Sequence, residues 1–145
     1  MEPMMEALTQ GLDAMGLRYE TCADPLGAAF GISAHNGHFD VRIALQPQAS
    51  TCVIVSRLPF FAPSQRRPAM AEMITRINYA LALGCFEMDF SDGEITFRIG
   101  IDVEDEGLTP NMVRNLLRPA IAAPDHFLGA ISAVAFTNVA PAAAL

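Results

Sequence analysis

The spacing of apolar residues predicts two helices in the first two thirds of the chain. Residues 4–15 and 66–83 carry apolar side chains at three- and four-residue intervals, which is typical of one buried helix face. Pro68 falls in the first turn of the second segment, where a helix tolerates proline. The two stripes are Met4, Met5, Leu8, Leu12 and Met15, and Met70, Met73, Ile74, Ile77 and Leu81.

Alternation of apolar and polar residues predicts strands between these helices. Residues 39–45 alternate strictly and follow Asn36-Gly37, a dipeptide that favours a two-residue type I′ turn. The alternation and the turn together predict a β-hairpin. Residues 17–22 and 51–57 are also expected to be extended, the latter as a more buried strand because it is almost entirely apolar.

A second hairpin and a last helix are expected in the C-terminal half. Apolar residues alternate with polar ones over residues 85–103, on both sides of a Ser-Asp-Gly turn, which indicates one dry and one wet face. Thr109-Pro110 is a typical helix start. We expect Pro119 and Pro124 to kink or split the helix that follows, because each removes a backbone donor.

The order of predicted elements is α-β-β-β-α-β-β-α. One strongly apolar side per strand favours an α+β fold, with an antiparallel sheet of five or six strands and helices on one face. A chain of 145 residues has the size of one domain. We therefore expect a single domain over residues 1–136 and a frayed tail over residues 137–145, which are rich in alanine.

Charge and composition limit the classes of binding partner and the cellular compartment that we expect for the protein. Nine basic and sixteen acidic residues give a net charge of −7, which disfavours nucleic acid as a partner. No continuous run reaches the roughly 18 apolar residues of a membrane span, so we expect no membrane association. The N-terminus lacks the early positive charge of a signal peptide, and three widely spaced cysteines fit a reducing compartment. These features predict a cytoplasmic protein.

No motif in the chain predicts catalysis, a cofactor or a metal. The sequence contains no GxSxG, GxGxxG or GxxxxGK[ST] pattern. The three histidines His35, His38 and His126 are too scattered for a recognised metal site. Acidic residues cluster on the second hairpin and its exit, but without the spacing of an EF-hand, and a solvated face explains them better.

Two neighbouring features are candidates for binding a partner. The segment Leu58–Pro63 is too rich in proline for a strand and too apolar for a solvated loop. Its Phe60 and Phe61 either cap the core or form an interface, because two exposed phenylalanines are costly in water. Arg66 and Arg67 stand at a helix start, where they either pair with the acidic hairpin or bind an anion.

The segment Ile77–Arg98 resembles the YbjN-like bacterial domain. The matching positions are Ile77-Asn78, Gly84, Phe86, Asp92-Gly93-Glu94 and Phe97-Arg98. The resemblance extends over about residues 66–132, with Pro119 and Pro124 as departures from a continuous last helix.

This resemblance implies a fold like that of type III secretion chaperones, which are small acidic α+β domains that often dimerise and hold segments of partner polypeptides. Likeness of fold does not by itself carry function. With the absent catalytic motifs, it leads us to expect a non-enzymatic, protein-binding homodimer with a chaperone-like or regulatory role. The alternative is a sensor domain that binds a small molecule or an anion through Arg66 and Arg67.

Overall fold

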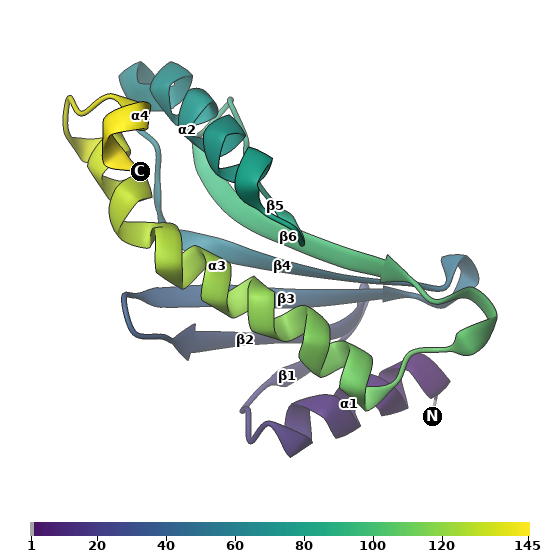
Figure 1. The fold of residues 1–145 in the computed structure, drawn as a ribbon. Helices are drawn as coiled ribbons and strands as arrows, with labels where there is room; N and C mark the ends of the chain where they lie inside the picture. The colour runs from purple at the N-terminus through teal and green to yellow at the C-terminus, as the bar shows by residue number, and fades with distance from the viewer. Residues whose placement is uncertain (1) are drawn as a thin grey trace.

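A computed structural model describes residues 2–145, and its centre is a six-stranded antiparallel sheet with helices on one face (Figure 1). The strand order is β1-β2-β3-β4-β6-β5. The elements are α1 (Pro3–Ala14), β1 (Glu20–Ala23), β2 (Leu26–Ser33), β3 (His38–Gln46), β4 (Thr51–Phe61), α2 (Arg67–Ala80), β5 (Cys85–Met88), β6 (Glu94–Asp102), α3 (Pro110–Phe136) and α4 (Pro141–Ala144). The predicted α+β class is confirmed, and the sheet has the larger of the two expected numbers of strands.

The alternating pattern of β3 explains why only one face of the sheet is covered. Phe39 and Ile43 are almost completely buried, whereas Asp40 and Arg42 between them are exposed. Helices α1, α2 and α3 lie on the apolar side (Figure 1), and their predicted stripes are buried there, except that Met15 and Leu81 follow the ends of α1 and α2 and are half-buried. Among the residues that the structure describes, none forms a helix on the opposite face (Figure 1). The polar positions of the strands therefore form an open surface.

The first hairpin is confirmed, but its predicted turn type is wrong. The loop between β2 and β3 spans residues 34–37, and the Ala34 amide donates to the Gly37 carbonyl at 2.8 Å. Neither Asn36 nor Gly37 has the positive φ of a type I′ turn. The reason is a tertiary contact with α3. The Asn36 backbone amide donates to Asp125 Oδ1 at 2.6 Å, and its side-chain amide donates to the Asp125 carbonyl at 3.0 Å.

The last helix is continuous, so a split at Pro119 or Pro124 is wrong, whereas the alternative, a kink, stays a prediction. Helix α3 spans 27 residues, with Thr109 capping its first turn and both Pro119 and Pro124 inside it. Proline at position 124 leaves the carbonyl of Ala120 without its helical amide donor. The buried Ser56 hydroxyl on β4 donates to that carbonyl at 2.6 Å. A hydrogen bond from the sheet thus replaces the missing helical one.

Four residues of the segment Leu58–Pro63, those up to Phe61, belong to the sheet, which corrects a second prediction. Strand β4 continues to Phe61, and the register with β6 shifts between Arg57 and Phe61. Proline is tolerated in a sheet at such an irregularity, because the local ladder is already interrupted. Pro59 lies within this interval and is exposed. The sequence favoured a loop because it does not reveal the irregularity.

Among the described residues, α3 is the one helix long and apolar enough to cross a membrane by length and composition, although it contains no unbroken apolar run of that size. Core helices meet the same test. Val113, Leu117, Ile131 and Val134 of α3 are fully buried within the domain, and the helix packs on β4 and β6. Its apolar side thus belongs to the core.

The end of the chain, for which the sequence predicts fraying, is folded in this structure. Helix α4 packs against α2 and α3, and its first residue, Pro141, is buried. The Arg66 guanidinium also donates to the Val139 carbonyl at 2.8 Å. These contacts attach residues 137–145 to the body of the domain.

Candidate partner-binding surface

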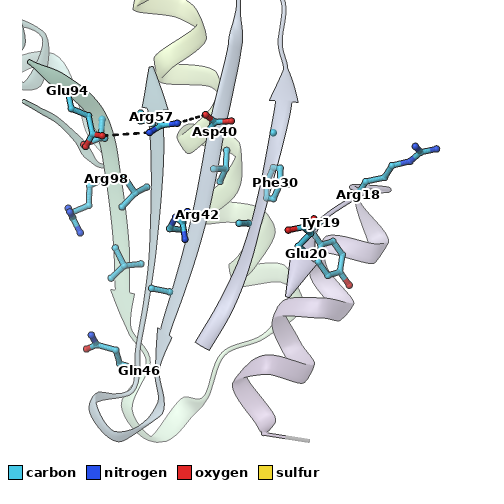
Figure 2. A pocket seen from close by; sticks show the side chains of 17 residues that line it. Arg18, Tyr19, Glu20, Phe30, Asp40, Arg42, Gln46, Arg57, Glu94 and Arg98 are labelled. Atoms are coloured by element: carbon cyan, nitrogen blue, oxygen red, sulfur yellow. Dashed lines mark hydrogen bonds and ion pairs between the residues drawn. The ribbon is translucent and has the colours of Figure 1, made fainter. Parts of the chain in front are cut away.

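The uncovered face of the sheet contains an open hollow of about 870 Å³ (Figure 2). Its lining comes from β2, β3, β4 and β6, from the first residue of β1 and from the segment that leads into that strand. We call the residues on this side of the sheet the open face. It combines arginines and carboxylates with small and apolar side chains, which include Ala29, Ala44, Val53 and Val55.

The strand register places the lining residues in rows that cross the sheet. Arg42 on β3 lies opposite Ala29 on β2 and Val55 on β4, and Val55 lies opposite Arg98 on β6. Directly paired residues in antiparallel strands project to the same face. The row therefore places two arginines on either side of an apolar position.

Two ion pairs are centred on Arg57, which lies opposite Asp40 in the next row on the same face. Its Nη2 lies 2.8 Å from Asp40 Oδ2, and its Nη1 lies 3.9 Å from Glu94 Oε2 (Figure 2). The hydrogen bond to Asp40 raises the pKa of Arg57. Because all three side chains are exposed, these pairs contribute at most about 1 kcal/mol each to stability. Their main effect is to hold the guanidinium in one orientation.

Arg98 is engaged in a similar way at the far side of the open face. Its Nη2 lies 2.9 Å from Glu87 Oε1, which also accepts a 3.0 Å hydrogen bond from the Thr96 hydroxyl. The hydrogen bond to Glu87 raises the pKa of Arg98. Both carboxylates near Arg57 and the one near Arg98 are thus already paired within the domain.

Arg42 differs from these two arginines. Among the described residues, no carboxylate lies within ion-pair distance of its guanidinium, and the side chain is exposed. Figure 2 shows it in the middle of the hollow, between the strands that carry Arg57 and Phe30. Arg42 therefore offers its donors to an acidic or carbonyl group from outside. The sequence did not single it out, although its place in an alternating strand already indicated an exposed position.

The two phenylalanines predicted to bind a partner point to opposite sides of the sheet. Phe60 is half-buried and packs edge-to-face on Phe136 of α3, with ring centroids 5.0 Å apart. Phe61 is 45% exposed and lies opposite Glu94 in the register, which places it on the open face. The core-capping alternative thus fits Phe60, and the interface alternative fits Phe61.

The two arginines from the same prediction bind main-chain carbonyls. Arg66 donates to the carbonyls of Val134 and Val139, at 2.7 and 2.8 Å, and so joins the end of α3 to the following segment. Arg67 donates to the Ala62 carbonyl at 3.1 Å and reaches the turn between β5 and β6. Both guanidinium groups therefore already donate hydrogen bonds to carbonyls of this chain. This geometry gives no support to the alternative that Arg66 and Arg67 bind an anion.

The acidic residues of the second hairpin stabilise their own turn. Asp89 accepts hydrogen bonds from the Ser91 hydroxyl at 2.6 Å and from its amide at 2.9 Å, and these bonds lower the pKa of Asp89. Asp92 accepts from the Glu94 amide at 2.9 Å. Among the side chains that the structure describes, no three His, Cys, Asp or Glu residues converge in a way that could hold a metal ion.

This fold, with an antiparallel sheet covered by helices on one face only, is also found in known proteins. The crystal structure of YbjN from E. coli is similar with a TM-score of 0.59 and 19% identity, over 92% of this chain and 89% of that one. The ExsC-ExsE complex follows with a TM-score of 0.57 and 12% identity, over 84% and 88% of the two chains. The HopA1-SchA chaperone-effector complex is similar with a TM-score of 0.56 and 10% identity, over 81% of this chain and 87% of that one. At these identities the likeness shows a shared fold, that of secretion chaperones.

The family follows from the sequence match over residues 5–133. The chain belongs to the YbjN family, described as "Putative bacterial sensory transduction regulator". The match covers most of the chain and confirms the resemblance noted at Ile77–Arg98. No curated protein matches the chain at a significant level.

Proposed function

We propose that this protein is a non-enzymatic, chaperone-like or regulatory domain of the cytoplasm that binds a segment of a partner polypeptide on the open face of its sheet. The observation that carries this proposal is the open face itself. It is wide and uncovered, and it holds apolar positions such as Val55 beside the unpaired Arg42. A mixed surface of this kind suits a peptide, which presents both apolar side chains and carbonyl or carboxylate groups.

The shape of the hollow favours a polypeptide over a small molecule. Small-molecule sites usually enclose most of their ligand in a concave, largely apolar pocket. Here the hollow is open to solvent and extends across four strands, with charged side chains along its length. Two of the similar structures are complexes of two proteins, and one of them is named a chaperone-effector complex. This supports the proposal by likeness of fold.

The partner segment is expected to place an acidic residue at Arg42 and an apolar residue beside it. Asp40 and Glu94 already neutralise Arg57, so Arg42 is the arginine in the middle of the hollow with free donors. Phe61 lies opposite Glu94 on the open face and offers the partner a further apolar contact. Central apolar and arginine side chains commonly supply most of the binding energy of an interface.

Reversal of one charge tests this proposal. Arg42→Glu should weaken capture of the partner by tenfold or more, measured as co-purified polypeptide per mole of tagged protein from cells of its source. Arg114→Glu is the matched control, because Arg114 is exposed on α3, away from the open face, and makes no ion pair among the described residues. Equal capture by the two variants would argue against the open face as the binding surface.

We further propose that the protein acts as a homodimer. Phe136 is 57% exposed and Phe90 is 58% exposed, on segments that Arg66 and Arg67 tie to the start of α2. Exposed aromatic side chains at one end of a small domain are typical of an interaction surface. Light scattering coupled to size exclusion should give twice the chain mass, and Phe136→Ser should lower it. A monomer at micromolar concentration would contradict the dimer.

A further inference from the structure

Strand β6 extends beyond its outer neighbour and leaves part of the sheet edge open. The last pair in the β5–β6 ladder is Cys85 with Arg98, whereas β6 continues to Asp102 (Figure 1). On its other side, β6 remains paired with β4 as far as Thr51 and Asp102. Within the described part of the chain, the residues of β6 after Arg98 therefore have a sheet neighbour on one side only.

The direction of the backbone groups at this edge follows from two hydrogen bonds. The Asp89 amide donates to the Glu94 carbonyl on the β5 side, and the Val103 amide donates to the Ser50 carbonyl on the β4 side. Along a strand, successive residues direct their amide and carbonyl groups to alternate sides. Gly100 and Asp102 therefore direct theirs away from β4. Both residues are exposed, and no main-chain bond from the β5 side reaches either of them among the described residues.

A groove of about 460 Å³ runs along the same open edge. Its lining consists of residues 98–101 of β6, residues 82–85 before and at the start of β5, and Leu116 of α3. The apolar side chains among them include Leu83, Ile101 and Leu116. Leu83 is 62% exposed, in the segment between α2 and β5. The groove thus places apolar side chains on the helix-covered side of the unpaired strand, where alternate side chains of an added strand would lie.

We infer that this edge takes an extended segment of the partner polypeptide as an added strand, paired to Gly100 and Asp102. The inference rests on the proposed polypeptide-binding function and specifies a second contact for the same partner. An added strand satisfies the four outward main-chain groups by hydrogen bonds, and the apolar groove selects its side chains on one side. Binding through an unpaired sheet edge is specific to an extended chain and excludes a small molecule as its occupant.

The charge at this edge specifies the segment further. Asp102 stands at one of the two open positions, Glu104 and Glu106 follow it, and the chain as a whole carries a net charge of −7. A segment with apolar residues on one side and basic residues on the other complements both the groove and the acidic exit. A second copy of the chain would present the same acidic residues, and its own β5 already covers the rest of its edge. The foreign segment is therefore the better occupant.

The test uses a synthetic peptide in which lysine and valine alternate, and amide hydrogen exchange followed by NMR. The peptide should slow exchange of the Gly100 and Asp102 amides by tenfold or more, and a control peptide with a central proline should not. Asp102→Pro should weaken binding by tenfold or more relative to Asp102→Ala. Both variants lose the Asp102 carboxylate, which accepts from the Glu104 amide at 3.0 Å, and only the proline variant loses the outward N–H.

Three results would overturn the inference. One is equal binding by the two Asp102 variants. The second is unchanged exchange at Gly100 and Asp102 in the wild-type protein, a readout that needs no variant to fold. The third is protection that rises with protein concentration without peptide, which would assign the edge to a second copy. The proposed function has its own test, the capture of the partner by the Arg42→Glu variant. If that variant loses the partner while no strand adds at Gly100 and Asp102, the proposed function stands and only the added strand is refuted.

Discussion

The hydroxyl of Ser56 donates a 2.6 Å hydrogen bond to the carbonyl of Ala120, and so links the middle of β4 to the middle of α3. Ala120 stands four residues before Pro124, at the one carbonyl that this proline deprives of its helical amide. Ser56 is fully buried, so neither group has access to water. One contact thus satisfies both a buried hydroxyl and a buried helix carbonyl.

Removal of the Ser56 hydroxyl should destabilise the protein strongly, although the substitution removes only one non-hydrogen atom. Ser56→Ala leaves the Ala120 carbonyl without a donor, and we expect a loss of about 1–3 kcal/mol in the free energy of unfolding, measured with urea. In a Pro124→Ala background the helical amide is restored. Ser56→Ala should then cost about 1 kcal/mol less. Strictly additive effects of the two substitutions would show that the hydroxyl does not replace the helical bond.

The turn that joins β5 to β6 depends on the absence of a side chain at Gly93. Gly93 has φ of +86°, and an added Cβ would collide with the carbonyl oxygen of Ala62. Gly16 also has a positive φ, +70°, but nothing lies near its Cβ position. Gly16→Ala should cost roughly 1–2 kcal/mol for the left-handed backbone alone. Gly93→Ala should cost a further ~1–3 kcal/mol by overpacking, measured by urea unfolding. Equal losses would show that the contact with Ala62 yields easily.

The buried thiol of Cys52 should make stability fall at alkaline pH. Burial raises the pKa of Cys52 to about 11, so the folded protein keeps this thiol neutral where the unfolded chain ionises it. The contribution to stability is complete below the pKa of the unfolded thiol and is lost as the pH rises toward about 11. The slope approaches about 1.4 kcal/mol per pH unit in that window.

Urea unfolding at about pH 8 and about pH 10 measures this slope. Cys52→Ala should lose less stability between the two values than the wild-type protein. Cys85→Ala provides the control, because it removes an exposed thiol instead of a buried one. If Cys52→Ala keeps the wild-type slope, another group causes the pH dependence.

The sequence predicted the fold well where local pattern and tertiary environment agree. The buried positions Leu8 and Ile77 lie on the stripes expected of their helices, and the alternation at Phe39 and Ile43 correctly identified the covered face of β3. The family resemblance at Ile77–Arg98 also held, because it rests on turn and packing residues that are close together in the chain.

Predictions failed where a distant residue decides the local conformation. Pro124 does not break α3 because Ser56 supplies a donor from the sheet, and Asn36 does not adopt a type I′ turn because Asp125 binds it from α3. The sequence separation in these contacts is 64 and 89 residues, beyond the reach of any local pattern. The candidate site shows the same limit, since Arg42 stands out only once the carboxylates around Arg57 are seen to be occupied.

Site-specific photo-crosslinking tests the role of the open face most directly. A benzophenone amino acid in place of Val55 lies in the hollow beside Arg42, and the same group in place of Arg114 on α3 is the matched control. In cells of the source, irradiation should join the Val55 variant to one partner polypeptide at a segment that carries an acidic and an apolar residue. The Arg114 variant should give no such adduct. A protein that crosslinks to no polypeptide through Val55, or equally through both positions, would contradict a binding role for this face.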